Sequence, residues 1–104
     1  MNNQTAILYA IERIESDFNA RNLPPYMWGA VSRYLQHGIE PGGFLKAVLC
    51  NDLFGAYARA DNMNTEVMKD WCMFIYNAVP GGCHGSVETY ERWVELGGLE
   101  GVSK

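Results

Sequence analysis

The fold is decided by residues 65–78, which read TEVMKDWCMFIYNA. Apolar residues in this stretch recur with the period of an α-helix, at Val67, Met68, Trp71, Cys72, Phe74 and Ile75. Asn64 precedes the stretch as an expected N-cap, and Pro80-Gly81 follows it as a stop signal. We therefore expect one amphipathic helix here, with its apolar face at the centre of a helical core.

Two helices are expected before this segment. The first spans residues 5–21, with Thr5 as its expected N-cap. Its apolar residues recur at helical spacing: Ile7, Ile11, Ile14 and Phe18. Pro24-Pro25 interrupts the chain and opens a second helix over residues 25–37, because proline fits only at the start of a helix. Gly38 then supplies the left-handed residue that ends it.

Residues 44–50, FLKAVLC, are too apolar for the surface. Their length fits a buried strand, but Pro41, the strong helix formers and the absence of a partner strand favour a short buried helix. Asn51-Asp52 bends the chain before a further helix over residues 53–60, and a turn is expected at residues 61–64.

Ser86 is the expected cap of a last helix over residues 87–96, which Gly97-Gly98 ends. The sequence thus predicts an all-α fold: a compact bundle of five to six short helices in one domain, residues 1–104. Residues 1–4 and 98–104 are expected to be loose at the two ends.

Composition narrows the function classes. The 104 residues are 48% hydrophobic and 19% charged, which argues against disorder. A net charge of −4 argues against direct nucleic-acid binding, which uses a basic surface. We expect no membrane span and no signal peptide, because the chain has no 18-residue apolar run and no basic start before an apolar stretch. A cytoplasmic protein is expected.

No catalytic, metal or cofactor signature is found among the chemically active side chains. Cys50, Cys72 and Cys83 are an odd number at wide spacing, which argues against both a disulfide framework and a zinc site. The one enzymatic alternative is Cys83 as a nucleophile with a histidine as its base, and His37 could meet Cys50 or Cys83 in space. We therefore expect no catalytic residue, no metal and no cofactor.

Three groups of residues are candidates for binding. The loop over residues 80–86, PGGCHGS, contains His84 and leads into a helix N-terminus that could hold an anion. A second group consists of polar residues that interrupt or follow an apolar run: Asn51, Asp52, Arg59 and Asp61. Of these, Arg59 could bind an anion. Aromatic residues exceed what one small core needs, and we single out Tyr26, Trp28 and Tyr57 as candidates for a contact patch.

Motifs in residues 26–64 and beyond resemble a group of small proteins of tailed bacteriophages and prophages. They are Tyr34, His37-Gly38-Ile39, Pro41-Gly42, Phe44-Leu45, Ala47-Val48-Leu49, Asn51-Asp52-Leu53, Arg59-Ala60-Asp61, Phe74-Ile75-Tyr76-Asn77, Pro80, Gly85-Ser86 and Trp93. The resemblance covers about three-quarters of the chain and brings no catalytic residues with it. It implies a phage protein that acts in the cytoplasm of a bacterial host.

Small phage accessory proteins often inhibit host machinery, so the resemblance implies a non-enzymatic protein that binds a host protein. The expected target is a subunit of a defence system such as CRISPR-Cas. One alternative is a small-ligand module that sequesters an anionic signalling nucleotide. Another is a structural or regulatory phage protein that forms a homo-oligomer.

Overall fold

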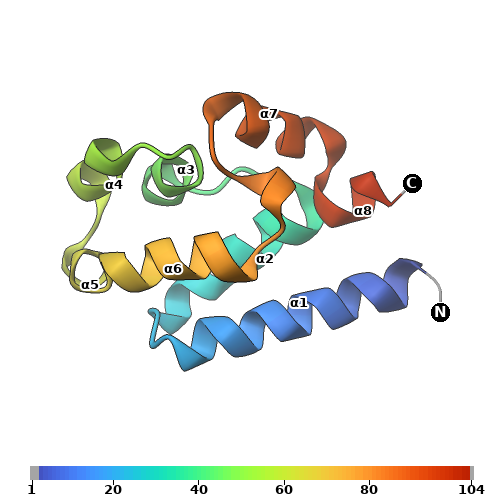
Figure 1. Ribbon diagram of the computed structural model, residues 1–104, viewed down its shortest axis with the longest axis horizontal. Coiled ribbons are helices and arrows are strands. Elements are labelled where there is room, and N and C mark those ends of the chain that lie inside the picture. The colour runs from blue at the N-terminus through green and yellow to red at the C-terminus, as the bar shows by residue number, and fades with distance from the viewer. Residues whose placement is uncertain (1–2, 104) are drawn as a thin grey trace.

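Helix α6 (Met68–Ala78) lies at the centre of the computed structural model, which describes residues 3–103 (Figure 1). This part of the chain is all-α, as predicted. Its elements are, in order, α1 (Asn3–Ala20), η1 (Pro25–Met27), α2 (Trp28–His37), α3 (Gly43–Leu49), α4 (Leu53–Arg59), α5 (Asn62–Glu66), α6, η2 (Gly81–Cys83), α7 (Val87–Leu96) and α8 (Gly98–Val102), where η marks a 3₁₀ helix.

The molecule is thin. Its extents are 41 × 29 × 20 Å, and the shortest equals about two helix diameters. Figure 1 shows α3, α4 and α5 gathered at one end and α7 and α8 at the other, with α1, α2 and α6 running between them. Because no helix is enclosed on all sides in so thin a body, each one keeps a face at the surface.

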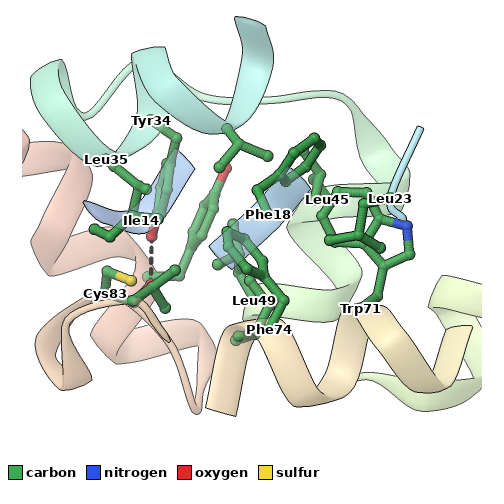
Figure 2. Packing of buried hydrophobic residues seen from close by; sticks show 14 of the residues in the cluster. Ile14, Phe18, Leu23, Tyr34, Leu35, Leu45, Leu49, Trp71, Phe74 and Cys83 are labelled. Atoms are coloured by element: carbon green, nitrogen blue, oxygen red, sulfur yellow. Dashed lines mark hydrogen bonds between the residues drawn. The ribbon is translucent and has the colours of Figure 1, made fainter. Parts of the chain in front are cut away.

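Trp71 of α6 is the centre of the core. Its indole is fully buried near Phe18 of α1 (Figure 2). It makes edge-on contacts with Phe18 at 5.9 Å and with Phe44 of α3 at 5.7 Å between ring centroids. The indole N–H donates a 2.8 Å hydrogen bond to the side-chain oxygen of Asn64, a buried polar residue. The stretch predicted to decide the fold therefore does supply the central contacts.

A second cluster joins α2, η2 and α7. The rings of Tyr34 and Tyr90 stack with centroids 5.4 Å apart. The Tyr34 hydroxyl donates to the Cys83 carbonyl oxygen at 2.6 Å, the bond drawn in Figure 2. The Trp93 indole N–H donates to the Tyr34 carbonyl oxygen at 2.8 Å. Tyr34 and Trp93 therefore pair their polar groups with backbone acceptors, as their burial requires.

The expected count of five to six helices is wrong: residues 3–103 contain eight α-helices. The residues expected to form a turn before position 65 instead form the one-turn helix α5, which Asp61 caps by accepting the Asn64 N–H at 2.8 Å. Asn64 is therefore not the N-cap that we predicted. Val67, at φ −111° and ψ 25°, separates α5 from α6, so residues 65–78 are not one continuous helix.

The C-terminal segment expected to be loose is folded. Gly98 is buried and opens α8, which packs on α2. The two helices approach closely here, since a Cβ atom on Gly98 would lie only 2.6 Å from the Gly38 nitrogen. Both Gly38 and Gly98 have φ +70°, a conformation that favours glycine. His37 Nδ1 and Glu100 Oε2 lie 2.5 Å apart and join the same two helices.

At the N-terminus, residues 3 and 4 belong to α1, and residues 1 and 2 lie outside the described residues. Thr5 lies within α1 rather than at its cap. The predictions for the other helix ends are confirmed at Gly38 and Gly97, both left-handed, and at Ser86, whose hydroxyl accepts the Thr89 N–H. None of the helices within residues 3–103 is long and apolar enough to span a membrane.

Candidate functional site

One surface cleft, here called the α4–α6 cleft, extends from the start of α4 along α6 to the loop before α7, and a further hollow of about 370 Å³ is lined by residues of the segments 19–25 and 63–67. The cleft consists of two adjoining hollows of about 280 and 60 Å³ that share Val48, Asn51 and Cys72. Tyr76 and His84 lie in the larger hollow, while Leu53 and Ala56 lie in the smaller one. The cleft therefore runs from the start of α4 to the loop that precedes α7.

The turn between α3 and α4 lines the cleft: Asn51 lines both hollows and Asp52 lines the smaller one. Asn51 adopts a left-handed conformation with φ 64°, and the next residue, Asp52, returns its N–H to the Ala47 carbonyl oxygen at 2.8 Å. The Asp52 side chain then caps α4 by accepting the Gly55 N–H at 2.9 Å. The Asn51-Asp52 break predicted from the sequence thus sets the angle between two short helices.

Six apolar side chains of α4 and α6 are exposed, and we call them the apolar rim: Leu53, Phe54 and Tyr57 from α4, and Cys72, Met73 and Tyr76 from α6. Leu53 lines the smaller hollow and the three α6 residues line the larger one, whereas Phe54 and Tyr57 line neither. Phe54 is 86% exposed and Tyr76 is 78% exposed. Helix α4 buries only Ala56, so most of its apolar residues face solvent. Exposed apolar side chains next to a cavity are typical of a protein-binding site.

The cleft is nearly uncharged. Asp52 is the one Asp, Glu, Lys or Arg among the lining residues that the structure describes, and its carboxylate already caps α4. His84 is half-buried, and burial lowers its pKa, so the imidazole is neutral at neutral pH. The chemistry on offer is apolar contact with a few neutral polar groups.

Arg59 lies on the other side of α4, away from the cleft. It lines a separate hollow of about 230 Å³ together with Lys46, Cys50 and Val87. Its Nη1 donates to the Gly55 carbonyl oxygen at 3.3 Å, and its Cδ lies so close to Gly43 that a Cβ there would be 2.9 Å away. Within residues 3–103, neither Arg59 nor Lys46 lies within 4.0 Å of a carboxylate.

The loop over residues 80–86 does not join Arg59 in an anion site. His84 and Gly85 line the α4–α6 cleft, whereas Arg59 lines the 230 Å³ hollow. The Cys83 N–H donates to the Pro80 carbonyl oxygen at 3.1 Å, and the Gly85 N–H donates to the Leu49 carbonyl oxygen at 2.8 Å. Two amides that an anion would use are therefore already bonded within the protein.

Tyr26, Asp61 and Trp28 have structural roles away from the cleft. The Tyr26 hydroxyl donates to the Asp61 carboxylate, which joins η1 to the N-cap of α5. This bond, together with the Asn64 N–H, lowers the pKa of Asp61. The Trp28 ring packs against Phe18, with centroids 5.2 Å apart. The structure thus does not bring these residues together with Tyr57 or His84 in one hollow.

The three thiols have different surroundings. Cys83 is fully buried, and burial raises its pKa to about 12, so it is protonated and shielded at neutral pH. Burial also raises the pKa of Cys50. Cys72, which the periodicity assigned to the buried stripe, is exposed in the cleft. Among residues 3–103, no three His, Cys, Asp or Glu side chains are grouped as metal ligands would be.

Sequence reasoning missed most of the apolar rim. The signal was present in α6, where Cys72, Met73 and Tyr76 form a second apolar stripe beside the buried one around Trp71. In α4 the signal was the pair of large apolar residues Leu53-Phe54, because this helix also contains several small residues and buries only Ala56.

Comparison with protein-family models gives no match, and comparisons with curated proteins and with solved structures give none either.

Proposed function

We propose that this chain is a non-enzymatic phage accessory protein that binds a protein of its bacterial host through the α4–α6 cleft. In this proposal it acts in the host cytoplasm and inhibits a defence system such as CRISPR-Cas. The observation that carries the binding role is the exposed apolar rim, of which Cys72, Met73 and Tyr76 line a cavity of about 280 Å³. The phage origin and the target class come from the resemblance described above.

The exposed aromatic residues have the size of interface anchors. An aromatic side chain offers ~150–250 Å². At 86% and 78% exposure, Phe54 and Tyr76 present roughly 300 Å² between them, against about 800 Å² per partner in a standard interface. Leu53, Tyr57 and Met73 add further exposed apolar area. Such residues are the ones whose truncation most weakens a complex.

The cleft also limits the chemistry of the partner. A cavity of ~150 Å³ is enough to hold a benzene ring, so the larger hollow can receive an aromatic or large aliphatic side chain. A charged side chain of the partner would find no oppositely charged residue among the described residues that line the larger hollow. Asp52 lines only the smaller hollow of the cleft, where its carboxylate caps α4. The net charge of −4 favours a partner with basic residues outside the apolar contact.

Affinity capture from host lysate with three forms of the protein tests the proposal: wild type, Tyr76→Ser and Tyr9→Ser. Tyr9 of α1 is the matched control, because it is 65% exposed and lines neither hollow of the cleft. The expected result is a host protein captured by wild type and Tyr9→Ser but lost with Tyr76→Ser, and then reproduced as a complex of purified components. Equal capture by all three forms would refute the docking surface.

A second candidate is suggested by Lys46 and Arg59 in the 230 Å³ hollow, which have no ion-pair partner among the described residues. This site would hold the phosphate of an anionic nucleotide. It is weaker because ligand pockets usually measure about 300–1,000 Å³. A ligand at ~100 times its dissociation constant adds about 2.7 kcal/mol of stability. A nucleotide panel that leaves the unfolding temperature unchanged would exclude it.

A further inference from the structure

We propose that the His84 imidazole makes the larger hollow of the α4–α6 cleft sensitive to pH. The hollow takes an uncharged aromatic side chain of the partner while the imidazole is neutral, and it excludes that side chain once the imidazole is protonated. That the occupant belongs to a protein partner rests on the proposed function. The pH sensitivity does not, because it is a property of the hollow and can be measured with a free aromatic molecule.

The loop that carries His84 is held on both sides of this residue. The carbonyl oxygen of the preceding residue, Cys83, accepts the Tyr34 hydroxyl at 2.6 Å. The N–H of the following residue, Gly85, donates to the Leu49 carbonyl oxygen at 2.8 Å. Because Cys83 is also fully buried, the backbone cannot readily carry its neighbour away. His84, which is half-buried, therefore stays in the wall of the hollow when its charge changes.

No carboxylate in the hollow compensates a positive charge on His84. Among the described residues that line the larger hollow, none is Asp, Glu, Lys or Arg; α6 contributes the titratable side chains of Cys72 and Tyr76, and α3 contributes none. Asp52 lines the adjoining smaller hollow and caps α4, and Glu88 lies in the first turn of α7. Burial lowers the pKa of His84, and no carboxylate of the described residues opposes this effect.

The rest of the larger hollow favours an aromatic ring. Its volume of about 280 Å³ exceeds the ~150 Å³ that holds a benzene ring. Its lining includes the sulfur-containing residues Cys72 and Met73 and the aromatic residue Tyr76, and both sulfur–ring and ring–ring contacts are favourable. A ring seated here removes water from the lining, His84 included. Occupation therefore lowers the pKa of His84 below its value in the free protein.

Proton linkage sets the direction of the pH dependence. Because burial already places the pKa of His84 below its ordinary value of about 6.5, the imidazole is neutral at about pH 7.5 and the affinity for the ring is then at its maximum. The affinity falls as pH decreases through the pKa of the free protein, since the proton has to leave before the ring enters. One proton limits this fall to about tenfold per pH unit.

The chain offers His37 as a matched control. It lies at the end of α2 beside Glu100 of α8, and it lines neither hollow of the cleft. The control variant is therefore His37→Asn, and the test variant is His84→Asn. His84 has the extended backbone angles φ −152° and ψ 171°, which asparagine also adopts, so thermal unfolding should show that the test variant remains folded.

Proton NMR of the purified chain with indole as the probe tests the inference. Indole is titrated at about pH 7.5 and again one unit below the pKa that the His84 imidazole signals give for free wild type. We expect indole to shift the signals of Met73 and Tyr76, with an affinity at least about threefold lower at the acid pH for wild type and His37→Asn. His84→Asn should bind indole equally at both pH values. In wild type, indole should lower the pKa of His84 and leave the titration of His37 unchanged.

Three results would overturn the inference: equal indole affinity of wild type at the two pH values, indole that shifts no signal of the larger hollow, or a pH dependence that persists in His84→Asn. In each case, host capture that is lost with Tyr76→Ser would still support the proposed function. Equal capture by wild type, Tyr76→Ser and Tyr9→Ser would instead refute the proposed function, while a pH-dependent affinity for indole would still support the role of His84.

Discussion

Replacing Gly98 by alanine tests whether α8 is held on α2 as the structure has it. Gly98 has φ +70°, a conformation that costs an L-residue about 1–2 kcal/mol. A Cβ atom there would also lie 2.6 Å from the Gly38 nitrogen and 2.7 Å from the Gln36 carbonyl oxygen, which are backbone atoms that cannot rotate away. The two helices must therefore separate or shift, at a cost beyond the conformational one.

Two other glycines provide matched controls for the separate contributions. Gly85 has φ +118°, and a Cβ atom there would have no neighbour within 4 Å, so Gly85→Ala measures conformational strain alone. Gly81 has neither a positive φ nor a neighbour within 4 Å, so Gly81→Ala should change the free energy of unfolding by less than about 0.5 kcal/mol. We expect about 1–3 kcal/mol for Gly85→Ala and a clearly larger loss for Gly98→Ala.

The assay is urea unfolding at equilibrium, followed by tryptophan fluorescence, with thermal unfolding in parallel. Each kcal/mol should lower the unfolding temperature by about 4–8 °C in a domain of this size. If Gly98→Ala is no more destabilising than Gly85→Ala, the close contact between α2 and α8 is wrong. If it matches Gly81→Ala, the C-terminal segment is loose, as the sequence pattern by itself suggests.

Three further predictions follow from the core and the titrating groups. Asn64→Ala removes the acceptor of a buried indole N–H and should destabilise the protein by about 1–3 kcal/mol in urea unfolding, whereas a loss under about 0.5 kcal/mol would contradict that bond. The hydrogen bond from the Tyr26 hydroxyl lowers the pKa of Asp61 in the folded state, so its contribution is present above the unfolded pKa of about 3.9 and is lost as pH falls through the folded value. The urea midpoint of wild type should therefore fall more steeply at acid pH than that of Asp61→Asn, and parallel curves would refute this. In the native protein a disulfide reagent should modify Cys72 rapidly and Cys83 only after unfolding; rapid labelling of both would contradict the burial of Cys83.

Helix identity could be predicted from the sequence wherever periodicity and end signals agreed. Residues 28–37 and 87–96 are examples, since Gly38, Ser86 and Gly97 serve as predicted, although Pro25–Met27, expected to begin the second helix, form the 3₁₀ helix η1. The divided helix near residue 67 could not be predicted in this way. Asn64 looks like a cap from its neighbours, but burial and the bond from the Trp71 indole give it another role, and that contact depends on tertiary structure.

The candidate site was less predictable than the fold. Asp52 and Arg59 are seven residues apart, a spacing that predicts one shared helix face, and both line the 230 Å³ hollow; Asp52 also lines the smaller hollow of the cleft, which Arg59 does not. The sequence pattern counts Tyr76 among the surplus aromatic residues without singling it out, and it does not pick out Phe54. Whether such a residue is buried depends on which face of its helix is covered, and a thin molecule covers few faces.

The most direct test of the central claim is the affinity of the host protein captured by wild type, measured by titration calorimetry against wild type, Tyr76→Ser and Tyr9→Ser. Truncation of an interface anchor costs ~2 kcal/mol or more, which is about 30-fold in affinity. We predict at least this loss for Tyr76→Ser and an unchanged affinity for Tyr9→Ser. Equal affinity of all three forms would contradict a docking surface at the α4–α6 cleft.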